Sequence, residues 1–195
     1  MKLVFATNNS KKILEARDIL PEKFQLRTLE EIDFHQEIIE DSDTFTGNAW
    51  IKANTIFKLK GEACFADDSG LVVPALGGLP GVKSARYANE TGIVDHKANN
   101  IKLLEAMREE KNRDAYFITV ICLILSNGEV HYFEGRVNGF IADREYGDKG
   151  FGYDPIFIPE NYTNTFGELG SEIKNAISHR ARALHAMHDF LIALP

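Results

Sequence analysis

Two adjacent carboxylates, Asp67 and Asp68, stand at the end of an apolar run in the segment FADDSG. Open α/β sheets bind their ligands at the ends of strands, and Mg²⁺ binds one or two carboxylates together with phosphate oxygens of a substrate. Glu40, in the acidic stretch 30–43, is a candidate third oxygen ligand. An aspartate at a strand end is also ordinary turn chemistry, so the pair alone leaves a structural role open.

The segment from Thr7 to Lys12, TNNSKK, joins an apolar run to a helical pattern. Such a loop directs backbone N–H groups and the positive end of a helix dipole toward a ligand, and phosphate suits both. Lys11 and Lys12 oppose the dipole in the first helical turn unless an anion compensates them. The alternative is an asparagine N-cap followed by two solvated lysines.

The segment KGFGYDP, residues 149–155, places Phe151 and Tyr153 among glycines. In this setting the backbone could approach a flat ring closely while one of the aromatic side chains stacks on it. A plain glycine turn that buries an aromatic side chain is the alternative. The segment is therefore a candidate for binding a nucleobase.

The segment EIKNAISHRARA adds the polar residues Lys174, His179 and Arg180. On one continuous helix Lys174 and His179 would lie about 140° apart, so they would not share a face. They can converge if a helix begins at Ser178, and the donors of His179 and Arg180 could then meet the carbonyl oxygens of a base. Solvated polar side chains on a surface helix are the alternative.

The spacing of apolar residues predicts the elements that position these groups. Strands and helices alternate in the first half, where strands are expected at 2–7, 24–29 and 64–70 and helices at 11–20, 44–60 and 95–108. Gly61 is expected to end the second helix. The third helix is expected to bury Ile101, Leu104 and Met107 on one face.

In the second half of the chain, the spacing of apolar residues changes to one typical of strands. Two β-rich runs, 115–125 and 129–142, flank Asn127-Gly128, a strong hairpin signal. A last helix is expected from Ser178, with a buried stripe of Ala181, Leu184, Met187 and Leu191. Helix-interleaved strands followed by a hairpin predict the α/β class with a mixed β-sheet flanked by helices.

The composition narrows the possible functions. The 195 residues are 44% apolar and 26% charged, which fits a single globular domain over 1–195. A net charge of −7 with no concentration of Lys and Arg argues against a nucleic-acid partner. No segment reads as a signal or membrane span, so a cytoplasmic protein without a membrane partner is expected. Cys64 and Cys122 lie in apolar runs and are expected to pack as small hydrophobic side chains.

Taken together, the motifs resemble the inosine triphosphate pyrophosphatases, which hydrolyse non-standard purine nucleoside triphosphates such as dITP, ITP and XTP. Six blocks match in the family's order over nearly the whole chain: ATNNSKK, GNAWIKA, FADDSGL, LGGLPGVKSARY, GFGYDP and KNAISHRA. The resemblance implies an elongated mixed sheet in two lobes around a central nucleotide cleft, and a homodimer. It also implies a metal-associated reaction, for which Mg²⁺ is the expected cofactor.

The resemblance assigns roles to individual residues. It implies that Asp68 is the catalytic carboxylate and that Glu40 and Asp68 are the metal ligands. The residues implied to contact the triphosphate or substrate are Thr7, Asn8, Asn9, Ser10, Lys11, Lys12, Lys52 and Ser69. Those implied to bind the base are Phe151, Gly152, Tyr153, Asp154, Lys174, His179 and Arg180. The chain departs from the common pattern at Asn8, where many members have glycine, and at Ile39-Glu40, where many have two glutamates.

The expected reaction is attack of a carboxylate-oriented water on the α-phosphorus, which yields a nucleoside monophosphate and pyrophosphate. Donors in the base pocket would favour the 6-oxo group of hypoxanthine or xanthine over the amine of adenine. Two other functions remain open from the residues alone: a nucleotide-binding regulator without catalysis, and a phosphohydrolase that releases orthophosphate from the γ-position.

Overall fold

The computed structural model describes residues 1–89 and 94–194. Its six-stranded sheet has the order β2-β1-β3-β4-β5-β6. Strand β1 pairs in parallel with β2 and β3, and β5 pairs antiparallel with β6. The strands are β1 (Lys2–Phe5), β2 (Gln25–Arg27), β3 (Cys64–Val72), β4 (Asp114–Ile124), β5 (Val130–Ile141) and β6 (Phe157–Pro159). The predicted mixed sheet of an α/β fold is confirmed.

Five α-helices accompany the sheet: α1 (Ser10–Ile19), α2 (Phe45–Lys60), α3 (His96–Ala106), α4 (Ser171–Ile177) and α5 (His179–Ala193). Short 3₁₀ helices lie at Glu30–Ile32, Pro74–Leu76, Gly81–Arg86 and Asp154–Ile156. These are the helices of residues 1–89 and 94–194. No helix within them is long and apolar enough to cross a membrane.

The helix ends follow local sequence signals. The side chain of Asn9 caps α1, and that of Thr44 caps α2, each by accepting hydrogen bonds from backbone N–H groups of the first turn. Helix α2 ends at Gly61, as predicted. Helix α4 ends at Ile177 and α5 begins at His179, so the expected break at Ser178 is present.

The chain forms two compact units. Unit 1 comprises Met1–Asp68, Thr119–Gly135 and Arg180–Pro195, and unit 2 comprises Ser69–Ile118 and Arg136–His179. Strands β3, β4 and β5 therefore contribute residues to both units.

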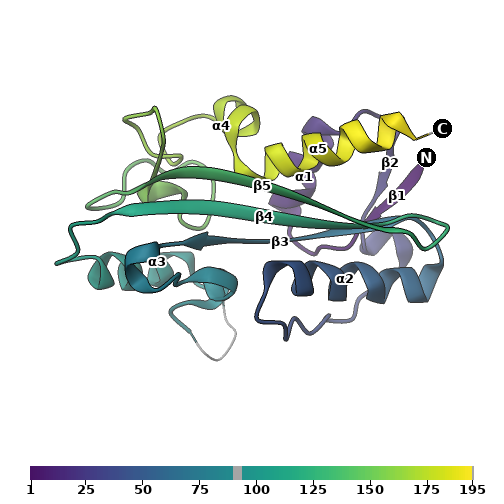
Figure 1. The fold of residues 1–195 in the computed structure, drawn as a ribbon, viewed down its shortest axis with the longest axis horizontal. Helices are drawn as coiled ribbons and strands as arrows, with labels where there is room; N and C mark the ends of the chain where they lie inside the picture. The colour runs from purple at the N-terminus through teal and green to yellow at the C-terminus, as the bar shows by residue number, and fades with distance from the viewer. Residues whose placement is uncertain (90–93, 195) are drawn as a thin grey trace. The chain divides into compact units, whose positions relative to one another are not determined.

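In unit 1, helix α2 covers one face of the sheet, and α1 and α5 cover the other (Figure 1). Side chains alternate between the faces along each strand. In β3, Phe65 packs in the core with α1 and α5, whereas Cys64 and Ala66 pack in the core with α2. This alternation decides where the next two residues of β3, Asp67 and Asp68, point.

The two cysteines lie in the core under α2, as predicted for small hydrophobic side chains. Both are free and buried, and burial raises the pKa of each thiol to about 12. The Cys64 thiol donates a hydrogen bond to the carbonyl oxygen of Ala53 in α2.

Unit 2 has its own core, formed by apolar residues of α3 and of the strand ends within the unit. The expected face of α3 is wrong in one position, because Ile101 is 48% exposed whereas Leu103 and Met107 are fully buried. The helix also buries Asn99 and Asn100, so polar contacts as well as apolar ones set its orientation. Helix α4 and strand β6 were not expected from the sequence, and both are shorter than eight residues.

Candidate functional site

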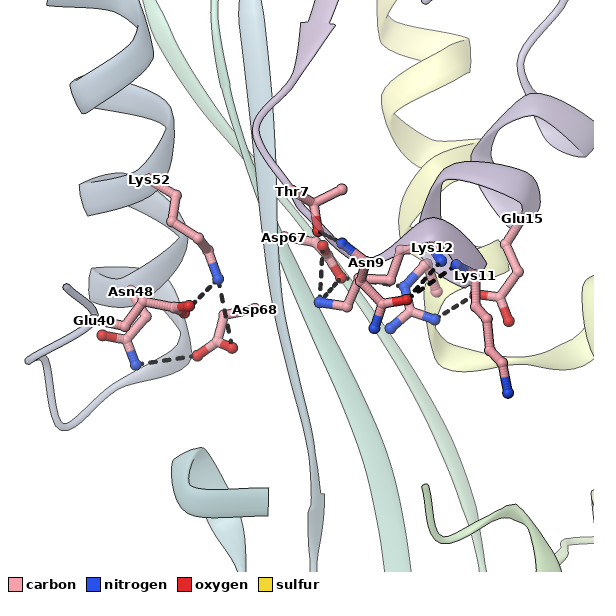
Figure 2. A network of polar contacts seen from close by, with 11 residues as sticks. Thr7, Asn9, Lys11, Lys12, Glu15, Glu40, Asn48, Lys52, Asp67 and Asp68 are labelled. Carbon is pink, nitrogen blue, oxygen red and sulfur yellow. Dashed lines mark hydrogen bonds and ion pairs between the residues drawn. The ribbon is translucent and has the colours of Figure 1, made fainter. Parts of the chain in front are cut away.

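The adjacent residues Asp67 and Asp68 point to opposite faces of β3 (Figure 2). Strand β3 continues through both residues to Val72, so the period-two alternation of a strand separates their side chains. The expectation that Asp67 lies beside Asp68 in one metal site is therefore wrong. Each carboxylate belongs to a different cluster in unit 1.

Asp67 lies in a buried ion-pair cluster on the α1 and α5 side of the strand. Its carboxylate accepts from Lys12 Nζ, at 3.0 Å from Oδ1 and 2.9 Å from Oδ2, and from Arg180 Nε at 3.1 Å. Arg180 also donates to Glu15. Burial alone would raise the pKa of Asp67, but the charges of Lys12 and Arg180 outweigh it and hold the pKa well below its usual range.

The segment that precedes α1 folds onto its own first turn. Thr7 Oγ1 accepts from the backbone N–H of Asn9, and Asn9 Oδ1 accepts from those of Lys11 and Lys12 at 3.0 and 3.3 Å. The expectation that this loop presents unbonded N–H groups is therefore wrong for these three amides. The lysines diverge, because Lys12 points to Asp67 whereas Lys11 is exposed, as are Asn8 and Ser10.

Asp68 faces helix α2. Its Oδ2 accepts from Asn48 Nδ2 at 3.2 Å, and its Oδ1 lies 3.9 Å from Lys52 Nζ. Lys52 also donates to Glu40, so one ammonium group stands between two carboxylates (Figure 2). Burial raises the pKa of Asp68, and the charge of Lys52 opposes the rise only in part.

Asn48 was missed as a site residue in the sequence. It precedes Lys52 by four positions, which places both side chains on one face of α2. Two sequence features could have indicated a site role for Asn48. It lies in the family block GNAWIKA, and it has this spacing from Lys52. Besides donating to Asp68, Asn48 accepts from the backbone N–H of Ser42 at 2.9 Å.

Glu40 and Asp68 form a donor set that suits a hard divalent cation. Mg²⁺ needs one or two carboxylates plus substrate oxygens, and these two carboxylates already converge on one positive charge, that of Lys52. Within residues 1–89 and 94–194, no group of three or more His, Cys, Asp and Glu side chains is arranged to hold a metal. A pair of carboxylates fits the way proteins hold Mg²⁺, by one or two carboxylates together with substrate oxygens and water.

Three of the expected base-binding residues meet in unit 2. Lys174 Nζ lies 2.7 Å from Asp154 Oδ2 and 4.5 Å from the centre of the Phe151 ring. Asp154 Oδ2 also accepts from the backbone N–H of Phe151 at 2.7 Å. A Cβ atom at Gly150 would stand 2.1 Å from this oxygen, so the turn requires glycine there. The half-buried Gly152 lies in the same turn.

The other expected base-binding residues have different surroundings. Tyr153 is buried in the core of unit 2 and its hydroxyl donates to the carbonyl oxygen of Ser84 at 2.8 Å, while burial raises its pKa. His179 is buried and stacks on Phe117, with ring centres 4.7 Å apart. Arg180 lies in unit 1 with Asp67 and Glu15. Ser69 is half-buried in β3.

Comparison with known proteins gives consistent matches over nearly the full length. The Ham1 family matches residues 3–190. A protein of Flavobacterium johnsoniae named dITP/XTP pyrophosphatase is 49% identical over 193 residues, which cover 99% of each chain. One of the same name from Porphyromonas gingivalis is 50% identical over 192 residues, which cover 98% of this chain and 97% of that one.

Solved structures agree with the fold. The Ham1 protein of Staphylococcus aureus has a TM-score of 0.90 at 38% identity, with 98% of each chain covered. A structure described as a nucleoside-triphosphatase and dITP/XTP pyrophosphatase from Mycobacterium abscessus has a TM-score of 0.78 at 41% identity, covering 96% of this chain and 98% of that one.

Proposed function

The chain belongs to the Ham1 family, and we propose that it hydrolyses dITP, ITP and XTP to the nucleoside monophosphate and pyrophosphate. The names of its relatives support this substrate class. The observation that carries the proposal is the Asp68 carboxylate, buried between Asn48 and Lys52 and sharing Lys52 with Glu40. By removing such triphosphates, the enzyme would keep them out of DNA and RNA.

Glu40 and Asp68 would hold Mg²⁺, which when bound supplies charge neutralisation on the phosphates and a fixed orientation for them. The buried Asp68 would orient the attacking water, whose oxygen forms a bond to the α-phosphorus as the bond to the leaving pyrophosphate breaks. Lys52, already between the two carboxylates, would neutralise charge on the phosphates. Lys12 would do the same from the opposite side of β3.

The segment from Thr7 to Lys12 and Ser69 would contact the triphosphate. Since Asn9 already accepts from the amides of Lys11 and Lys12, we assign the loop's contribution chiefly to side chains, with Lys12 the main cation. Lys11, being exposed, would contribute by its charge alone.

In unit 2 we assign the base to Phe151 and Lys174, with Asp154 and Gly152 shaping the turn around them. The Phe151 ring would stack on the purine, and Lys174 would donate to the 6-oxo group that adenine lacks. Tyr153 and His179, both buried, would support this region through Ser84 and Phe117. Arg180 would act through Asp67 and Lys12.

We further propose one domain of the inosine triphosphate pyrophosphatase type over 1–195, a homodimer, and a cytoplasmic location without nucleic-acid or membrane partners. The family match over 3–190 supports the first of these. Light scattering on the purified protein would test the dimer, since a monomer mass would contradict it.

The deciding experiment is incubation of the protein with ITP and Mg²⁺, followed by separate measurement of pyrophosphate and orthophosphate. Release of pyrophosphate with no orthophosphate is the expected result. Orthophosphate would indicate hydrolysis at the γ-position, and neither product would indicate a binding protein. Equal turnover of ATP would contradict the assignment of the base-binding residues.

A further inference from the structure

We propose that Asn48 is a positioning residue that sets the arrangement of Glu40 and Asp68 for the reaction. The inference rests on the proposed function. Asn48 lies on α2, is only 2% exposed, and uses both ends of its amide. One end holds the loop that carries Glu40, and the other holds the Asp68 carboxylate.

The hydrogen-bond partners fix which end of the amide is which. The backbone N–H of Ser42 can only donate, so the atom of Asn48 that faces it at 2.9 Å is the oxygen Oδ1. The nitrogen Nδ2 must then face Asp68 Oδ2, at 3.2 Å, and donate to it. The amide therefore cannot be reversed without breaking both contacts.

The loop before α2 is held closely at this point. Thr44 Oγ1 accepts from the backbone N–H of Gly47, and a Cβ atom at Gly47 would stand 2.0 Å from Ser42 Oγ. Only glycine at 47 lets the loop pack this near to the helix. Since Ser42 is two residues from Glu40, the bond from Ser42 to Asn48 limits where the Glu40 carboxylate can lie.

The other half of the amide orients Asp68. A carboxylate oxygen has two lone-pair directions, so the bond from Asn48 fixes the rotation of the group without preventing Oδ2 from binding a cation. Lys52 approaches the other oxygen, Oδ1, from one turn further along α2. Asn48 thus supplies a neutral donor where a second cation would compete with a metal.

The substitution Asn48→Asp distinguishes the contribution of the amide oxygen from that of the amide nitrogen. An aspartate has the same shape and still accepts from Ser42, but it sets an oxygen against Asp68 Oδ2 in place of a donor. We expect kcat for ITP to fall about 10- to 100-fold, as for other groups that orient metal-binding carboxylates. The KM for ITP at saturating Mg²⁺ should change by less than about threefold, because the proposal gives Asn48 no contact with substrate.

Asn99 provides a matched control. It is the fourth residue of α3 as Asn48 is the fourth of α2, it is also 2% exposed, and its Oδ1 accepts from the backbone N–H of Ala88. Its Nδ2 donates to the backbone carbonyls of Ser84 and Ala85, and among residues 1–89 and 94–194 to no carboxylate. Asn99→Asp should lower the melting temperature as Asn48→Asp does, while kcat per folded molecule stays within about twofold.

Amide hydrogen exchange supplies a readout that does not depend on turnover. The Ser42 N–H should remain protected in Asn48→Asp and exchange faster in Asn48→Ala, which removes both bonds. If Asn48→Asp fails to fold, Asn48→Ser, which adds no charge, should show the same loss of kcat.

Wild-type kcat in Asn48→Asp, or in Asn48→Ser where the aspartate variant does not fold, would overturn the proposal. So would an equal loss of kcat in Asn99→Asp, since the effect would then be general. Failure of the wild type to release pyrophosphate would instead overturn the proposed function, while Ser42 exchange would still report on the loop contact.

Discussion

The two faces of β3 at Asp67 and Asp68 carry different kinds of charge cluster. On the α1 and α5 face, Asp67 is enclosed with Lys12 and Arg180, and Arg180 reaches Glu15, so these side chains carry two negative and two positive charges. On the α2 face, the carboxylates of Asp68 and Glu40 both lie near the ammonium group of Lys52. Among the side chains named, two cations accompany two carboxylates on the first face, and one cation accompanies two carboxylates on the second.

The difference indicates different tasks for two neighbouring residues of the same type. A buried, balanced network loses stability when one member is removed, because the remaining charges are left uncompensated. Two carboxylates that share one ammonium group can gain from an added cation, which suits the proposed Mg²⁺ site. We therefore expect the loss of Asp67 to affect chiefly stability and the loss of Asp68 to affect chiefly catalysis.

The largest expected effect is on catalysis and comes from Asp68→Asn. Losing the carboxylate that we propose orients water should lower kcat for ITP by about 10²- to 10⁴-fold. Stability should stay the same or rise, because burial raises the pKa of Asp68 and a neutral amide removes that cost. Pyrophosphate release and urea unfolding measure the two effects, and turnover at the wild-type rate would remove Asp68 from the mechanism.

The sequence separation of each contact decides whether it could be predicted from the sequence. The end of α2 at Gly61 was predicted, and an asparagine N-cap before α1 was considered as an alternative, because such signals act within a few residues. The separation of Asp67 from Asp68 was also encoded locally, since Phe65 and Ala66 already alternate between the two cores. Treating FADDSG as a strand end rather than a strand interior hid it.

The partners of these carboxylates could not be predicted in the same way. Lys12 is 55 positions from Asp67, and Arg180 is 113 positions away. Contacts at such distances depend on how α1 and α5 pack on the sheet, which apolar spacing in one segment does not specify. For the same reason Arg180 was grouped with its sequence neighbour His179, although the two belong to different units.

The second largest effect should be on stability and come from Asp67→Asn. Removing this charge leaves Lys12 and Arg180 with Glu15 as the remaining anion of the cluster, so unfolding should become easier by about 3–5 kcal/mol. Urea unfolding monitored by circular dichroism measures the change. An unchanged midpoint, or a stability loss as large in Asp68→Asn, would show that the two faces of β3 do not differ as described.

A smaller effect on metal use should come from Glu40→Gln. The Mg²⁺ concentration for half-maximal activity should rise about tenfold, because one of two carboxylates is lost while Asp68 remains. Stability should change little, since Glu40 belongs to a loop and is one-third exposed. Glu37→Gln, an exposed residue of the same acidic stretch, is the matched control and should leave the Mg²⁺ dependence unchanged. Equal shifts in both variants would indicate a general charge effect.

The smallest expected effect is on the pH dependence of stability and comes from Cys64 and Cys122. Both lie in the core between the sheet and α2, on the Asp68 face. Burial raises the pKa of each thiol to about 12, against about 8.5 for a free cysteine. The folded state therefore keeps protons that the unfolded state releases. This contribution to stability is fully present below about pH 8.5 and is lost as the pH rises toward 12. Native protein at pH 8 should react with a thiol reagent only as fast as it unfolds, and fast labelling without unfolding would show that this face is open beneath α2.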